Sequence, residues 1–283
     1  MRIRLAQSAA LAIVVVAGCF GGTEPAGRGQ SSEWQALAPA SLARTEVAAA
    51  RVGRHVYVMG GFERDSGATT AATERYDIER DRWTRVADMP SVLNHAAAAS
   101  YEGRVYVLGG YRARTGLNRE VATLYRYDPG RDRWTSLPAA PTSRGALAVG
   151  VIGDRLYAVG GANTPRGALA TLEIYDFAER RWRTGPDMAI PREHLAAAVA
   201  GGRFYALAGR AAGQGNFTVV ESYDPRERRW RREPEMAKPR GGIAAATSGG
   251  RIVVLGGEEE AGTNAEVERY DPSERLQRRS AKS

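Results

Sequence analysis

The stretch "YDPGRDRW" at 127–134 is one of four copies of a pattern in which a Tyr-Asp pair is followed by Trp, six residues after the Asp. The Tyr-Asp pairs begin at 76, 127, 175, 223 and 270, so successive copies lie 51, 48, 48 and 47 residues apart. Gly-Gly pairs precede them at 60, 109, 160 and 256, and Ala208-Gly209 takes the place of the missing pair. A period this regular indicates copies of one structural unit.

Each unit has the pattern of four short β-strands and no helical periodicity. The first segment is small and apolar, as in "AAAASY" (96–101), and the second is β-branched and aromatic, as in "VYVLGG" (105–110). A Gly-containing turn such as Glu102-Gly103 separates them, which is typical of a hairpin. A third strand carries the Tyr and a fourth carries the Trp. Four strands in about 48 residues are typical of a propeller blade.

These motifs resemble the kelch repeat, and the resemblance covers about residues 34–276. It implies an all-β fold, a five-bladed kelch-type β-propeller. The Ala-rich first strand suits the innermost position, where the strands converge on the axis. The Tyr and Trp side chains suit the widening wedges between blades, where each buries a large apolar area.

The fifth copy, "YDPSERLQ" (270–277), has Gln277 where the others have Trp. At the other end of the chain, "WQALAPASLAR" (34–44) matches "WTSLPAAPTSR" (134–144), a fourth strand that leads into the next blade. We therefore expect an N-terminal strand with Trp34 to complete the last blade, which removes two unpaired strand edges. A truncated six-bladed propeller is the alternative.

The first residues predict export and lipidation. Arg2 and Arg4 precede an apolar run that is too short for a membrane span. Val16-Ala17-Gly18-Cys19 resembles the bacterial lipobox, which implies a lipid on Cys19 and a lipid-anchored protein of the cell envelope, at the outer membrane or periplasmic face. An ordinary cleaved signal with an incidental Cys is the alternative. The predicted parts are a signal peptide at 1–18, a flexible tether at 19–32, the propeller at 33–276 and a basic tail at 277–283.

The net charge of +8 does not indicate a nucleic-acid-binding protein. Of the 40 basic residues only Lys238 and Lys282 are lysines, and the arginines are scattered without a basic stripe or a recognition helix. The single cysteine excludes an internal disulfide. We expect a monomer with no cofactor.

Antiparallel topology predicts which loops share a face. The loops between strands two and three, and those leading from strand four into the next strand one, emerge on the same side, where binding residues usually lie. The long loops are 62–73, 111–122, 162–171, 210–219 and 258–266. We expect Arg112, Arg166 and Arg210 on these loops to contact a ligand.

A second set of candidates precedes strand one, sixteen residues before each Gly-pair position. We call this position the arginine slot; it holds Arg44, Leu93, Arg144, Arg192 and Arg240. Four arginines around a channel mouth would form a ring that binds a carboxylate or an acidic peptide. The alternative is that each arginine caps backbone carbonyls between blades.

His95 and His194 lie at equivalent positions, two residues after the slot. Imidazole is a good metal ligand, but the two repeats are not neighbours and no carboxylate or Cys accompanies the histidines at ligand spacing. We therefore count both as ligand-binding candidates and expect no metal site.

The sequence holds no nucleophile elbow, phosphate loop or Cys-His pair. Copper chemistry of the galactose-oxidase kind needs a Tyr cross-linked to Cys, and the only cysteine is Cys19. We expect an envelope-anchored binding or scaffold protein, not an enzyme, that recognises a protein or carbohydrate partner through the long-loop face. The kelch resemblance also implies an alternative, a sialic-acid-type sugar mutarotase, although such enzymes are expected to have six blades. For this reaction Glu46 and Glu193 are the acid and base candidates.

Overall fold

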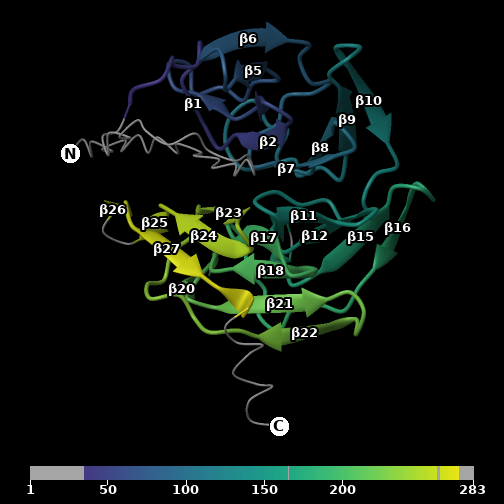
Figure 1. Cartoon of the computed structure of the whole chain (residues 1–283), viewed down its shortest axis with the longest axis vertical. Coiled ribbons are helices and arrows are strands. Elements are labelled where there is room, and N and C mark those ends of the chain that lie inside the picture. The colour runs from purple at the N-terminus through teal and green to yellow at the C-terminus, as the bar shows by residue number, and fades with distance from the viewer. Residues whose placement is uncertain (1–34, 165, 260–261, 274–283) are drawn as a thin grey trace, which may run out of the picture.

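The computed structural model describes residues 35–164, 166–259 and 262–273, and it is an all-β, five-bladed propeller arrangement (Figure 1). Four blades are antiparallel sheets of four strands, ordered from the axis outwards as they occur in the chain. The first blade holds β2 (Ala48–Val52), β3 (His55–Met59), β5 (Thr73–Asp77) and β6 (Arg82–Val86). The second holds β7 (Ala97–Tyr101), β8 (Arg104–Leu108), β9 (Leu124–Asp128) and β10 (Arg133–Leu137).

The remaining blades repeat this order. The third holds β11 (Ala148–Ile152), β12 (Arg155–Val159), β15 (Leu172–Asp176) and β16 (Arg181–Thr184). The fourth holds β17 (Ala196–Ala200), β18 (Arg203–Leu207), β21 (Val220–Asp224) and β22 (Arg229–Arg232). In its described part the fifth holds β23 (Ala244–Ser248), β24 (Arg251–Leu255) and β27 (Val267–Tyr270).

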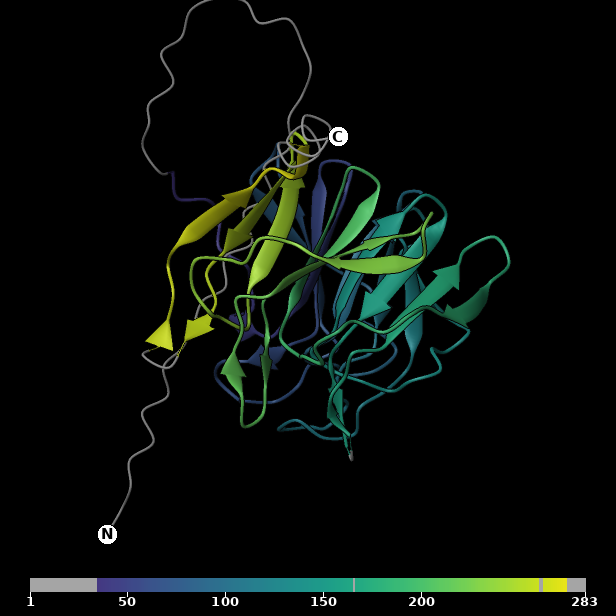
Figure 2. The ribbon, with the colours of Figure 1, turned by 90° about the horizontal axis from the view of Figure 1, so that it is seen from below.

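The long loops contain short two-residue ladders that the sequence did not predict. They are β1 (Arg44–Thr45) with β4 (Phe62–Glu63), β13 (Ala162–Asn163) with β14 (Gly167–Ala168), β19 (Arg210–Ala211) with β20 (Gly215–Asn216), and β25 (Glu258–Glu259) with β26 (Gly262–Thr263). In Figure 2 the green β19–β20 and yellow β25–β26 hairpins lie on the same side of the molecule. The long-loop face is therefore partly ordered by backbone pairing.

The core lies between blades, as the aromatic pattern predicts. Tyr127 of the second blade packs on Tyr57 of the first, with ring centroids 5.5 Å apart, and both side chains are buried. Tyr223 of the fourth blade packs in the same way on Tyr157 of the third, at 6.0 Å. Because each such ring removes a large apolar area from water, these contacts join successive blades.

Each of the four described Trp side chains also donates a hydrogen bond to a backbone carbonyl outside its own blade. Trp134 Nε1 donates to the Ala87 carbonyl at 2.8 Å, four residues beyond Trp83 in the previous blade. Trp83 Nε1 donates in the same way to the Ala38 carbonyl at 2.8 Å, and Ala38 lies four residues beyond Trp34. Asp81 accepts from Ala38 N at 2.8 Å, as Asp132 accepts from Ala87 N at 2.8 Å. Residues 35–40 therefore occupy the place of a segment that leaves a fourth strand.

Trp34 and Gln277 lie outside the described residues, so closure of the fifth blade by the N-terminal strand stays a prediction. Cys19, the signal and tether segments and the basic tail also lie outside them. Within the described ranges, no helix has the length and hydropathy needed to span a bilayer.

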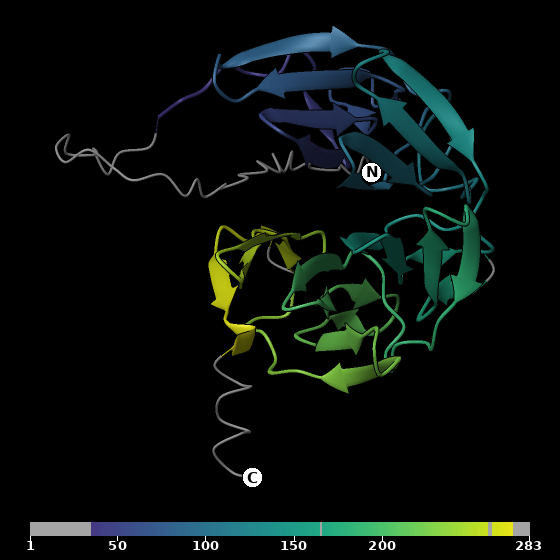
Figure 3. The same cartoon turned by 45° about the vertical axis from the view of Figure 1, so that its right-hand side comes forward.

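Successive innermost strands pack on one another, β2 on β7, β7 on β11, β11 on β17 and β17 on β23. Backbone hydrogen bonds follow the same path, since His95 N donates to Glu46 O, and Gly242 N, three blades later, donates to His194 O. Among the described residues no corresponding bond joins Glu46 N to Gly242 O. The first and fifth blades stand at the two ends of this series (Figure 3).

Removal of the N-terminal segment should destabilise the whole domain. A chain that begins at residue 39 lacks the Ala38 carbonyl and leaves the half-buried Trp83 indole N–H without its acceptor, and loss of such a hydrogen bond typically costs about 0.5–1.5 kcal/mol. Urea denaturation should show a lower free energy of unfolding than for a chain that begins at residue 33. Equal stabilities would show that residues 33–38 do not stabilise the domain.

Candidate active site

One position in every blade has a left-handed backbone and lies around the axis. It follows the arginine slot by two residues, and its φ lies between 49° and 62°. We call these five positions the axial ring: Glu46, His95, Ala146, His194 and Gly242. Backbone hydrogen bonds link each member to the next. A left-handed conformation costs a residue with a β-carbon about 1–2 kcal/mol, so the fold holds three polar side chains in a conformation that Gly would adopt more easily.

The axial ring lines a cavity of about 610 Å³ on the long-loop side. Its polar lining is formed by Glu46, His95, His194, Glu258 and Asn264, and apolar side chains such as Leu147 and Leu195 complete the wall. Small-molecule sites generally have volumes of about 300–1,000 Å³ and this mixture of apolar walls with a few polar groups. The cavity is therefore the first candidate for a functional site.

Hydrogen bonds fix the tautomer of His95. The buried Asn94 donates its amide Nδ2 to Thr69 Oγ1 at 2.9 Å, so its Oδ1 faces His95 Nδ1 at 2.7 Å. His95 Nδ1 must then carry the hydrogen, which leaves a lone pair on Nε2. Burial, followed by the neighbouring charge of His194, lowers the pKa of His95 to about 3, so the imidazole is neutral.

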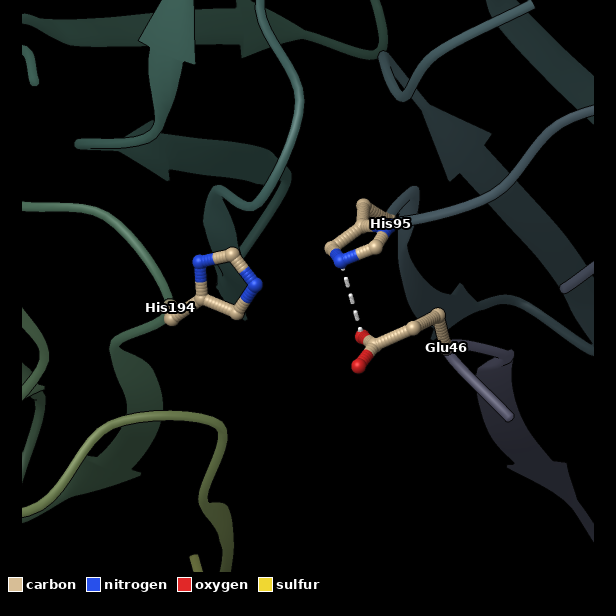
Figure 4. A group of neighbouring side chains, drawn as sticks. All are labelled: Glu46, His95 and His194. Atoms are coloured by element: carbon tan, nitrogen blue, oxygen red, sulfur yellow. Dashed lines mark ion pairs between the residues drawn. The ribbon is translucent and has the colours of Figure 1, made fainter. Parts of the chain in front are cut away.

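The lone pair of His95 points at a carboxyl group. His95 Nε2 lies 3.2 Å from Glu46 Oε2, and Figure 4 shows both side chains directed into the same space. Two acceptors do not approach so closely unless one of them carries a proton. Burial raises the pKa of Glu46, and Glu258 and Glu193 act in the same direction, although the charges of His194 and Arg210 act in the opposite direction. The proton therefore lies on Glu46, and the two residues form an acid and a base.

His194 faces the same pair from the fourth blade. Its ring lies edge-on to that of His95, with centroids 4.9 Å apart, because Ala146 between them has only a methyl side chain. His194 Nδ1 lies 3.1 Å from Glu193 Oε2 but is not aligned for a hydrogen bond. The structure thus brings the two histidines together although their blades are not neighbours.

Glu46, His95 and His194 could also hold a metal ion, since each offers a ligand atom and all three atoms lie within 4.8 Å of one another. Linear spacing does not reveal this group, because its carboxylate lies far from the histidines along the chain. Glu46 lies 49 residues before His95, one repeat away. The expected absence of a metal site stays a prediction.

Arg210 lies beside the cavity and is held by two carboxylates. Its Nη1 donates to Glu258 Oε2 at 2.7 Å, and its Nε donates to Glu193 Oε1 at 3.3 Å. Backbone pairing positions both partners, because Glu193 bridges to Arg210 and Gly241 bridges to Glu258. Arg112 and Arg166 are exposed on other loops, and their predicted role in ligand binding stays a prediction.

The predicted ring of arginines at the channel mouth does not form. Arg144, Arg192 and Arg240 are at most 1% exposed, and the Arg44 side chain is 2% exposed. Each binds a glutamate of the third strand of its blade, at 2.6 Å for Arg44–Glu74, 2.9 Å for Arg144–Glu173 and 2.5 Å for Arg192–Glu221; Arg240 binds Glu268 in the same way. Other N–H groups of these side chains bind backbone carbonyls such as Gly60 O and Gly160 O, whereas the buried Nε of each has no hydrogen-bond partner. These guanidinium groups are occupied inside the blades and do not line the cavity.

The second blade replaces this ion pair with an apolar pair. Its slot holds Leu93, and the position of the glutamate, two residues before the Tyr of Tyr-Asp, holds Tyr125. Both side chains are buried, at 1% and 7% exposed, and belong to one core cluster. The second blade thus lacks both the arginine and its glutamate partner, as expected if the slot residue stabilises the blade and does not bind a ligand.

The same exchange should work in the third blade. Arg144→Leu leaves Glu173 buried and unpaired, and removal of one partner of a buried ion pair typically costs about 3–5 kcal/mol. The double variant Arg144→Leu/Glu173→Tyr copies the second blade and should regain most of that loss in urea denaturation. A double variant no more stable than Arg144→Leu would contradict the structural role.

Comparisons with known proteins agree with this architecture. The model of the KLHDC2/KLHL20/DRC7 Kelch-repeats domain matches residues 28–188 and 94–277. The chain belongs to the kelch-repeat family. Kelch-like protein terF of Aspergillus terreus is 35% identical over 125 residues, which are 42% of this chain and 27% of that protein. Kelch repeat and BTB domain-containing protein 2 of Pongo abelii is 25% identical over 132 residues, or 47% and 19% of the two chains.

This kelch chain thus spans about a quarter or less of the length of these curated relatives. Among solved structures, that of YjhT aligns with a TM-score of 0.73 over 83% of this chain and 84% of the other, at 15% identity. At this identity the likeness concerns the fold alone.

Proposed function

We propose that this kelch protein is a sugar mutarotase whose acid and base are Glu46 and His95. The observation that carries the proposal is the 3.2 Å contact of the Glu46 carboxyl group with the His95 imidazole in the wall of a cavity of about 610 Å³. A module that binds a partner on a broad surface has no need for a deep cavity with an acid beside a base. Mutarotation requires little more than such a pair.

The reaction interconverts the two anomers of a cyclic sugar. Glu46 donates its proton to the ring oxygen while His95 Nε2 accepts the proton of the anomeric hydroxyl, so that the bond between C1 and the ring oxygen breaks and C1 becomes a carbonyl. Rotation about the C1–C2 bond exposes the other face of the carbonyl. The former ring oxygen then attacks C1 and returns its proton to Glu46, and His95 returns the other proton to the carbonyl oxygen. Both residues regain their initial states.

Neighbouring groups maintain these protonation states. Asn94 holds the hydrogen of His95 on Nδ1 and keeps Nε2 free as a base. Glu193, the second acid candidate from the sequence, instead pairs with Arg210, and although its burial acts in the opposite direction, contacts with His194 and Arg210 lower its pKa. It is therefore ionised and cannot serve as the acid.

Glu46→Gln and His95→Gln should each slow the interconversion of the anomers of a hexose by about 10²–10⁴-fold, the usual contribution of general acid–base catalysis. Polarimetry or NMR on a freshly dissolved single anomer measures the rate above the uncatalysed background. Glu102→Gln, in an exposed turn outside the cavity, is the matched control and should retain full activity. Protein freed of metal by a chelator should also remain active, and loss of activity there would indicate that the three ligand atoms hold a metal.

The pH profile separates the two roles. The catalysed rate should fall as pH rises through the raised pKa of Glu46, because the acid is then ionised. On the acid side it should fall only near pH 3, where His95 becomes protonated. If either variant kept both limbs of this profile, the assignment of the pair would fail.

We place the protein at the bacterial cell envelope, anchored through Cys19, on the sequence motif alone; release of Cys19→Ser from the membrane fraction is the test. Recognition of a protein or carbohydrate partner by the long-loop face, with Arg112 and Arg166 as contacts, stays the second hypothesis. The cavity opens on that same face.

A further inference from the structure

The ionisable residues in the cavity wall are two glutamates and two histidines. Among the described lining residues they are Glu46, His95, His194 and Glu258, with no lysine or arginine. This is unusual in a chain of net charge +8. A site that recognises a carboxylated sugar would be expected to present a guanidinium group to it, because guanidinium binds carboxylate with two parallel hydrogen bonds.

The nearest cation cannot supply that contact. Arg210 donates to Glu258 and to Glu193, so two carboxylates surround one guanidinium group. The slot arginines are buried in the blades with glutamate partners of their own. An anionic ligand would have to displace Glu258 from Arg210 and would then lie beside both carboxylates.

Glu258 contributes a carboxylate to the cavity wall. Its backbone is fixed, since its N–H donates to Gly241 O at 2.7 Å and its carbonyl accepts from Asn216 Nδ2 at 2.7 Å. Its carboxyl carbon lies 3.5 Å from the place a β-carbon would take at Gly242, so the carboxylate occupies the room left by the glycine of the axial ring. The side chain is 42% exposed and remains open to a ligand.

The Glu258 carboxylate attracts a cation placed beside it and repels an anion. Water screens a charge at the half-exposed Glu258, so we expect selectivity rather than tight binding from this contact.

We propose that the axial cavity selects sugars without a negative charge and prefers amino sugars, whose ammonium group pairs with the Glu258 carboxylate. This rests on the proposed mutarotase activity for turnover, but not for binding. It departs from the sialic-acid-type substrate implied by the family resemblance, because that substrate carries a carboxylate.

The test uses three matched series of hexoses, those of glucose, galactose and mannose, each as the neutral sugar, the 2-amino sugar and the uronic acid. The ratio of the catalysed rate constant kcat/KM for the amino sugar to that for the uronic acid should be at least about tenfold, which corresponds to about 1.4 kcal/mol. Saturation-transfer NMR on the same nine sugars measures binding without turnover. Both readouts should rank the series as amino, neutral and acidic.

Glu258→Gln should lower the ratio of amino sugar to uronic acid several-fold in both measurements, since it removes the carboxylate and frees one side of Arg210. Glu259→Gln changes the neighbouring carboxylate, which does not line the cavity, and should keep the ratio of the unmodified protein. This comparison separates a contact at Glu258 from a general change in net charge.

The outcomes distinguish the two proposals. Preference for uronic acids, with turnover, would overturn the charge selection and leave the mutarotase assignment in place. Charge-ranked binding without catalysed interconversion would overturn the mutarotase and support the selection. If the Glu258 and Glu259 variants shifted the ratio equally, the contact with Glu258 would be refuted.

Discussion

The junction between successive blades is the contact on which the rest of this structure depends. At each junction the backbone carbonyl of the slot residue accepts a hydrogen bond from the preceding blade. Gly61 N donates to Leu93 O at 2.8 Å, and Gly110 N donates to Arg144 O at 2.9 Å. Where the slot holds arginine, its side chain enters the following blade and meets a glutamate. The second glycine of each pair is at positive φ, and a β-carbon there would lie within 2.9 Å of a backbone carbonyl oxygen, so this position favours glycine, whereas the first position accepts Ala208 in the fourth blade.

The same junction also positions the side chains that line the axial cavity. Two residues after the slot the chain turns with a left-handed residue towards the axis, so whatever side chain stands there enters the cavity. Two of the five positions hold Ala146 and Gly242, which leave room, and the others hold an acid and two imidazoles. A rigid scaffold thus carries an interchangeable set of side chains, and this is why fold alone does not decide function in this family.

The repeats made the architecture predictable from the sequence, because the spacing and the strand pattern are local properties that recur in every repeat. The kelch assignment, the all-β class and the five blades are confirmed. The site was predictable only in part. His95, His194 and Glu46 were named, but their convergence depends on backbone angles around an axis, which linear spacing does not contain. The slot arginines were correctly predicted to lie on the connection from a fourth strand to the next first strand. Their side chains were predicted to point to the channel mouth, but they point into the blades, where the partner glutamates lie 28 to 30 residues further along the chain.

The exchange of an ion pair for Leu93 and Tyr125 in one blade shows that the units are separable components. Every junction uses the same donors and acceptors, so a duplicated or deleted unit meets neighbours that it already fits. Each duplication would also add one left-handed position to the axial ring, and with it one new side chain at the cavity. In such a molecule the number of blades and the set of side chains at the axial cavity change together, so duplication of one unit alone would alter the lining of the cavity.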